Sequence, residues 1–146
     1  TRRDLLKKLM DDTIPGDIQP YFIHFWLEAV FAAGRRDAYT LRILEKWKKP
    51  VLDCPKGMAE GFVKPEPTYR FDHSHAWAGT PLYALPKALL GLEILEPGMT
   101  RLRLKPDLMG LKQAHIELLT PMGKVICDLC EGEQPRIRAP KEIAVD

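Results

Sequence analysis

The sequence lacks an excess of charge of either sign. It has 22 Lys and Arg residues against 20 Asp and Glu residues in 146 positions, and the basic residues are scattered along the chain. A nucleic-acid-binding domain ordinarily gathers its basic residues into a patch or stripe. No run of apolar residues approaches the roughly 18 that a membrane-spanning helix needs. We therefore expect neither a nucleic acid nor a membrane as a partner.

Cysteine is scarce, with three residues in the chain. Cys127 and Cys130 form a lone C-x-x-C within residues 125–130, which have the composition of a strand. Residues three apart on a strand point to opposite faces, so the two sulfurs should diverge. A second cysteine pair for zinc and a βαβ context for a redox motif are both absent. We predict packed free thiols and expect no metal and no other cofactor.

The ends of the sequence indicate a piece of a longer protein, because it begins at Thr1 and stops in the middle of a pattern at Asp146. A targeting segment would then lie outside the sequence, so the compartment, bacterial cytoplasm or periplasm, stays open. The apolar content of 45% is enough for a packed core.

Residues 1–94 have the periodicity of helices. The pattern alternates between segments with one apolar stripe and segments that are apolar nearly all round. The expected order is an amphipathic helix over 1–12, an enclosed helix over 20–33, an amphipathic helix over 36–49 stopped by Pro50, a long loop, and an apolar helix over 76–90 capped by Gly91. Concentric rings of helical hairpins require this alternation, whereas a simple four-helix bundle gives every helix a single stripe.

The helix over 20–33 begins with Pro20 and ends before Gly34, two residues suited to those positions. We interpret its aromatic residues as core, namely Tyr21, Phe22 and Phe25. His24 and Glu28 are four residues apart on one face and could either pair with each other or point into a pocket.

Residues after 95 carry the signals of strands. A turn at 96–99 has Pro and Gly where a type II turn needs them, and Leu102 and Leu104 alternate with basic residues. Two further strands are expected over 113–119 and 124–130. Short antiparallel strands with turns between them are typical of a β-sandwich. The strands expected here are too few to complete a β-sandwich, so we expect it to include strands from elsewhere in the sequence.

Three short motifs carry a resemblance to a known family. They are DHSHAWAGTP at 72–81, LLGL at 89–92 and EPG at 96–98, with LKP at 104–106 and TPMG at 120–123 in support. Together they resemble the junction between barrel and sandwich in the α-L-rhamnosidases of glycoside hydrolase family 78. The resemblance covers nearly the whole chain, most closely residues 73–123.

The resemblance implies a fold and a division into domains. Residues 1–94 would be the last helices of an (α/α)6 barrel of the six-hairpin glycosidase type. Residues 95–146 would be the beginning of a C-terminal antiparallel β-sandwich, still incomplete at Asp146.

The resemblance also implies chemistry. Members of this family invert the anomeric centre, which takes a general acid and a general base roughly 6.5–9.5 Å apart. The acid lies in an earlier part of the family's barrel, outside this chain. The base lies in the loop before the last helix, here residues 56–62, which makes Glu60 the candidate. The residues preceding Glu60 differ from the Thr and aromatic residues usual in the family, so Glu66 is the alternative.

His75 and Trp77 are the candidate sugar-binding residues. A neutral imidazole can hydrogen-bond sugar hydroxyls, and an indole ring can lie against the apolar side of a deoxy-sugar. Packing is the alternative for both side chains. Asp72 and His73 are more typical of capping residues. His73, His75 and Glu60 do not make a metal site, because histidines two apart on a helix diverge.

The expected function is therefore part of an inverting α-L-rhamnosidase, with partners in a rhamnose-containing glycan and the remainder of its own catalytic domain. Another six-hairpin glycosidase, such as an α-fucosidase-like enzyme, would have the same fold. A non-catalytic carbohydrate-binding or structural module is the alternative from a different class. The sequence leaves the oligomeric state open, a homo-oligomer included. We expect the isolated chain to be inactive and poorly stable, since the general acid and the neighbouring hairpins are missing.

Overall fold

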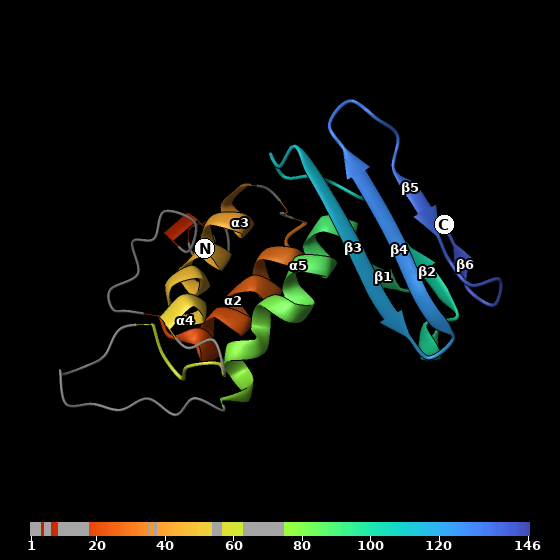
Figure 1. Ribbon diagram of the computed structural model, residues 1–146. Coiled ribbons are helices and arrows are strands. Elements are labelled where there is room, and N and C mark those ends of the chain that lie inside the picture. Colours follow the sequence, from red (N-terminus) through yellow and green to blue (C-terminus); the bar gives the residue numbers. More distant parts are fainter. Residues whose placement is uncertain are drawn as a thin grey trace. The chain divides into compact units, whose positions relative to one another are not determined.

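The computed structural model describes Asp4, Lys7, Lys8, Arg36 and residues 18–34, 38–53, 57–62 and 75–146 (Figure 1). The chain forms two compact units. Unit 1 contains Thr1–Arg35 and Tyr39–Tyr83, and unit 2 contains Arg36–Ala38 and Ala84–Asp146. The helix expected over 1–12 lies almost entirely outside the described residues, among which Asp4, Lys7 and Lys8 are helical.

Helix α2 spans Pro20–Ala32 and confirms the helix expected from sequence. Pro20 occupies its first turn, where a missing N–H costs nothing, and Gly34 adopts a φ of 71° just beyond its end. Its buried residues are spaced at i, i+3, i+4 and i+7, namely Ile23, Trp26, Leu27 and Val30. This spacing places them on one side of the helix.

The other side of α2 is not enclosed. Tyr21 is 38% exposed, Phe22 64% and Phe25 53%. The interpretation of these three aromatic residues as core is wrong for this structure, because the packed side of α2 is the one that carries Ile23 and Leu27.

The next helical segment is broken and longer than expected. It consists of α3 (Ala38–Leu44), the 3-10 turn η1 (Glu45–Trp47) and α4 (Lys48–Asp53). Leu44 and Trp47 are buried, as their spacing predicts. Pro50 does not stop the helix, contrary to expectation. The 3-10 turn restarts the helix at Lys48, so Pro50 falls in a first turn, where its lack of an N–H is tolerated.

The apolar helix expected over 76–90 is present as η2 (Ala76–Gly79) followed by α5 (Thr80–Leu90). The amide of Leu92 donates to the carbonyl of Lys87, and Gly91 takes a φ of 58°. This is the left-handed cap that the sequence predicts at Gly91.

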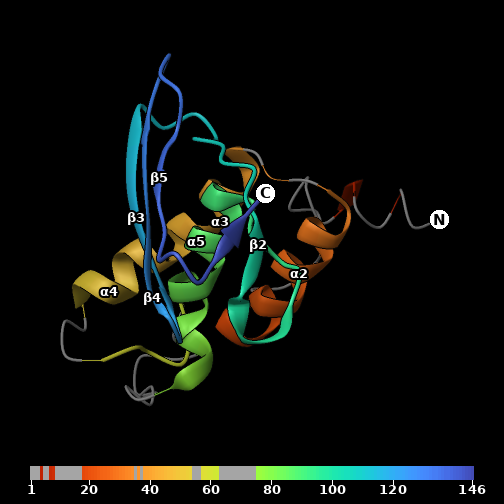
Figure 2. The ribbon, with the colours of Figure 1, turned by 90° about the vertical axis from the view of Figure 1, so that its right-hand side faces the viewer.

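Unit 2 contains two small sheets (Figures 1 and 2). Strands β1 (Glu93–Ile94), β2 (Arg101–Arg103) and β6 (Ala144–Val145) form one, in the order β1-β2-β6. Strands β3 (Gln113–Thr120), β4 (Gly123–Cys130) and β5 (Arg136–Arg138) form the other, which Figure 2 shows nearly edge-on. The change from helix to strand thus falls where the sequence predicts it.

The pairing of the strands is antiparallel except at one place. Strand β2 pairs with β6 in parallel, with Leu102 opposite Val145, which the sequence reading did not anticipate. A parallel pair needs a long connection, and here the connection contains the whole β3-β4-β5 sheet. The expected turn before β2 is confirmed: η3 (Pro97–Met99) has Gly98 at φ 70°, and the amide of Met99 donates to the carbonyl of Glu96 at 3.2 Å.

The two cysteines of β4 point to opposite faces, as expected, and neither is in a disulfide. Cys127 is fully buried beside Val125 and Leu129 on the inner face, where burial raises the pKa of its thiol. Cys130, at the end of the strand, is exposed. The prediction of packed thiols is therefore correct for Cys127 and wrong for Cys130.

Candidate functional site

The loop of residues 57–62 in unit 1 is held at two points. The carbonyl of Met58 accepts a hydrogen bond from the amide of His75 at 3.2 Å. The amide of Phe62 donates to Oε1 of Gln19, the residue before α2, at 2.8 Å. Between them lies Glu60, with Ala59 only 8% exposed. The backbone that carries Glu60 is thus fixed against the start of η2 on one side and the start of α2 on the other.

His75 lies immediately before η2 with an extended backbone, and its side chain makes no capping hydrogen bond to the turn. Its imidazole ring lies 5.2 Å from the indole ring of Trp77, tilted by 44°. The loop that carries Glu60 and the two candidate sugar-binding side chains therefore belong to one part of unit 1.

The backbone of η2 is anchored firmly. Nε1 of Trp47 donates to the carbonyl of Ala78 at 2.7 Å, and Oγ1 of Thr80 donates to the carbonyl of Trp77 at 2.9 Å. Ala78 and Thr80 are buried, whereas the side chain of Trp77 is 50% exposed. Half of the Trp77 surface is therefore left to solvent in this structure.

An aromatic surface continues from Trp77 onto α2. The rings of Tyr21 and Trp77 are 4.6 Å apart and meet edge to face. Tyr21 in turn contacts Phe22 at 5.2 Å and Phe25 at 5.4 Å, again edge to face. We call these four residues the aromatic surface. Edge-to-face contacts are a favoured geometry for aromatic pairs, so the rings hold one another while remaining open to solvent.

His24 of α2 is bound to a residue that sequence reasoning missed. Its Nδ1 lies 2.5 Å from the hydroxyl oxygen of Tyr83 in α5. Burial and, to a smaller extent, the negative charge of Glu28 together raise the pKa of Tyr83 to about 12. His24 and Glu28 were singled out by their spacing. The sequence feature that could have pointed to Tyr83 is its phenol hydroxyl, a polar group in a mostly apolar helical stretch.

Three other residues from the sequence reading, Glu66, Asp72 and His73, lie outside the described residues. Within the part of the chain that the structure describes, no group of three or more His, Cys, Asp or Glu side chains is placed to hold a metal ion. In that same part, no helix has both the length and the apolar character needed to cross a membrane.

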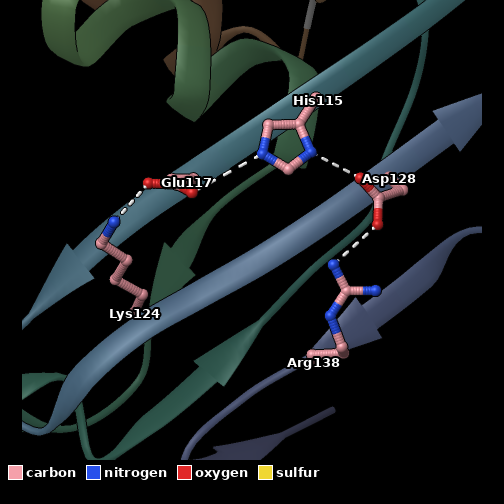
Figure 3. A network of polar contacts seen from close by, with 5 residues as sticks. All are labelled: His115, Glu117, Lys124, Asp128 and Arg138. Atoms are coloured by element: carbon pink, nitrogen blue, oxygen red, sulfur yellow. Dashed lines mark hydrogen bonds and ion pairs between the residues drawn. The ribbon is translucent and has the colours of Figure 1, made fainter.

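Unit 2 carries a network of charges on the outer face of β3, β4 and β5 (Figure 3). Nδ1 of His115 lies 2.5 Å from Asp128, whose other oxygen is 2.9 Å from Arg138. Glu117 lies 3.7 Å from Nε2 of His115 and 2.6 Å from Lys124. The hydrogen bond with Asp128 raises the pKa of His115, and the same bond lowers the pKa of Asp128. The side chains satisfy one another, which indicates a structural face.

A hollow of about 400 Å³ in unit 2 lies between the loop of residues 106–111 and residues 129–135. Two of its carboxylates already have partners. Asp107 accepts from the amide of Met109 at 2.7 Å, and Glu133 pairs with Arg136 at 2.7 Å. These contacts stabilise the two loops that line the hollow. The aromatic part of unit 1 is therefore the better candidate site.

Comparison with known proteins gives one informative result. No protein-family model matches the chain, and no curated protein matches it. The crystal structure of a GH78 family rhamnosidase of Bacillus sp. GL1 is similar to 96% of this chain, with a TM-score of 0.77. The chain has the fold of part of that rhamnosidase. The two sequences are 23% identical, and the similar region is 16% of the rhamnosidase chain. The likeness confirms the coarser part of the expected fold, helices followed by small sheets that resemble part of a GH78 rhamnosidase.

Proposed function

We propose that this chain is part of an inverting glycoside hydrolase that removes terminal α-L-rhamnose, and that it supplies the general base and sugar-binding residues. The observation that carries the proposal is the hydrogen bond between Met58 and His75, which joins the Glu60 loop to the start of η2. The likeness to part of a GH78 rhamnosidase supports the same assignment.

Glu60 acts in this proposal as the general base. Its carboxylate takes a proton from a water molecule as the water oxygen attacks the anomeric carbon. The bond from that carbon to the leaving-group oxygen breaks, and a general acid outside these 146 residues protonates the oxygen. A separation of roughly 6.5–9.5 Å between the two carboxyl groups leaves room for the water.

His75 and Trp77 hold the sugar in the same proposal. The imidazole of His75, which is not used for capping, is available to the sugar hydroxyls. The exposed indole of Trp77 offers a flat apolar surface. Rhamnose carries a methyl group at C6 and is therefore more apolar than most hexoses, which suits such a ring.

The architecture proposed around the site is the end of an (α/α)6 barrel over residues 1–94, with a sandwich domain from residue 95. In that arrangement the remainder of the catalytic domain packs against the exposed Phe22, whereas Phe25 and Trp77 stay open to the sugar. Large exposed aromatic groups close together on a helix are typical of surfaces covered by another polypeptide or by a ligand.

The decisive experiment replaces Glu60 by Gln in the enzyme that contains this chain. Glutamine keeps the shape of the side chain and cannot accept the proton of water, so kcat for p-nitrophenyl α-L-rhamnoside should fall on the order of 10² to 10⁴-fold. Azide needs no deprotonation and should partly restore turnover of E60Q. Binding of the substrate should change little.

Two variants serve as controls. Glu66→Gln should be nearly silent, and His75→Ala should mainly raise KM through lost sugar contacts. An inactive E66Q enzyme beside an active E60Q enzyme would assign the base to Glu66 instead. Full activity in both would place the base outside this chain. Preference for p-nitrophenyl α-L-fucoside over the rhamnoside would replace the proposed substrate.

A further inference from the structure

The contact between His24 and Tyr83 places a phenol hydroxyl against one nitrogen of the imidazole ring. The phenol oxygen lies 2.5 Å from Nδ1 of His24, within hydrogen-bond distance. Because burial and Glu28 raise the pKa of Tyr83 to about 12, the phenol keeps its proton at neutral pH and can donate it. A neutral imidazole has one N–H and one bare nitrogen. If Nδ1 accepts from Tyr83, Nε2 must carry the N–H.

The same imidazole lies at the edge of the aromatic surface. The His24 ring is 5.0 Å from the ring of Phe25, and Tyr21, three residues earlier on α2, contacts Trp77. The His24 side chain is partly exposed. The arrangement therefore offers an oriented N–H donor beside exposed aromatic rings. A sugar presents both complementary features, hydroxyl oxygens and an apolar C–H face.

We propose that His24 is a second sugar-contacting histidine, whose Nε2–H donates to a hydroxyl of the bound rhamnoside, and that Tyr83 is the positioning residue that holds His24 in this tautomer. The inference rests on the proposed function, because the ligand is the rhamnoside assigned there to His75 and Trp77. It adds a residue pair that links α2 to α5 within unit 1.

The first test follows the tautomer by long-range proton–nitrogen NMR of the histidine rings in the enzyme that contains this chain, labelled at histidine. At pH 7.5 the ring should be in the Nε2–H form, with Nδ1 showing the shift of a hydrogen-bonded acceptor. Tyr83→Phe should lose that Nδ1 signature. Tyr21→Phe is the control, because it deletes a phenol hydroxyl from α2, the helix that carries His24. It should leave the His24 spectrum unchanged. An identical His24 spectrum in wild type and Y83F would overturn the positioning role.

The second test uses kinetics in the enzyme that contains this chain. His24→Leu and Tyr83→Phe should each raise KM for p-nitrophenyl α-L-rhamnoside roughly five- to tenfold, the usual size of one lost hydrogen bond, with a smaller effect on kcat. His24→Gln can present an amide N–H near the place of Nε2 and should recover part of the loss. In the H24Q background, Tyr83→Phe should have little further effect, because its role is exerted through the imidazole.

The outcomes separate this inference from the function on which it rests. Unchanged KM in H24L and Y83F, with E60Q inactive, would overturn the role of His24 and leave the rhamnosidase proposal standing. An α2 surface buried by protein rather than by sugar would give that result. Wild-type enzyme without rhamnosidase activity would overturn both proposals, whatever the tautomer of His24.

Discussion

The two units differ in the side chains on their exposed faces. In unit 1 the exposed side of α2 carries Phe22 and Phe25, which are 64% and 53% exposed. In unit 2 the exposed face of β3 and β4 carries His115, Glu117 and Asp128. The charged groups of unit 2 are paired with one another and with basic neighbours. The aromatic rings of unit 1 contact one another and remain open.

This difference sets a surface of paired charges against a surface of large exposed aromatic groups. Paired charges interact with water at little cost, so the charged side chains of the outer sheet face need no further contact. Several large apolar groups close together are costly to leave exposed, and a protein or a ligand usually covers them. The comparison therefore favours unit 1 over unit 2 as the location of the proposed sugar site.

The largest effect is expected at Gly91, in the cap of α5. The Arg36 guanidinium donates to the carbonyls of Ala88 and Lys105 at 3.0 and 2.9 Å, and a Cβ on Gly91 would collide with that guanidinium and with the Lys105 carbonyl. The φ of 58° adds backbone strain for any other residue. Gly91→Ala should lower the free energy of unfolding of unit 2 by about 2–4 kcal/mol, measured by amide hydrogen exchange.

Gly132→Ala is the matched control in the same unit. Gly132 has a φ of 78°, but an added Cβ meets nothing within 4 Å. The cost should then be the backbone strain alone, about 1 kcal/mol. Equal losses for G91A and G132A would show that the close approach of Arg36 contributes nothing.

The sequence predicted the parts of this fold that depend on local rules. Helix α2 follows from Pro20, an apolar run and Gly34, and the cap at Gly91 follows from the preference of glycine for positive φ. Strands β3 and β4 follow from apolar residues with turn residues between them. The resemblance at residues 72–98 implied a piece of a GH78 rhamnosidase, and the structural likeness to part of one confirms that much of it.

The errors arose where packing at a distance decides the result. An apolar residue such as Phe22 has the same local pattern whether or not a neighbouring segment covers it, so its exposure could not be read from α2 alone. The parallel pairing of β2 with β6 joins residues more than 40 positions apart. Tyr83 and His24 are 59 positions apart, and no local pattern connects them. The roles of Glu60, His75 and Trp77 stay predictions.

A smaller effect is expected in the core of unit 1, at Trp47. Its side chain is 4% exposed, and its Nε1 donates a hydrogen bond to the carbonyl of Ala78 in η2. Trp47→Phe leaves that carbonyl without its partner and should lower stability by about 1–3 kcal/mol. All three tryptophans lie in unit 1, so fluorescence of Trp26 and Trp77 in denaturant reports on this unit. A stability unchanged from wild type would mean that η2 does not depend on Trp47.

The smallest effect is expected in the charged network of unit 2, and it should depend on pH. The pKa of His115 is raised from 6.5, so its stabilising contribution is complete below 6.5 and is lost as pH rises through the raised pKa. The pKa of Asp128 is lowered from 3.8, so its contribution is present above 3.8 and is lost as pH falls through the lowered pKa. The pair should therefore stabilise unit 2 most between about pH 4 and 6.5.

Thermal unfolding followed by far-ultraviolet circular dichroism should reveal this window. The difference in Tm between wild type and His115→Gln should be largest near pH 5.5 and should shrink above pH 7. Lys124→Gln provides a control in which the stabilisation should depend on pH in the opposite direction. Lys124 lowers the pKa of Glu117, so the contribution of their pair should persist to alkaline pH and disappear on acidification below 4.5. If the H115Q difference instead persisted at pH 9, the raised pKa of His115 would not be the source of the stabilisation, and the neutral imidazole would contribute through its hydrogen bond with Asp128.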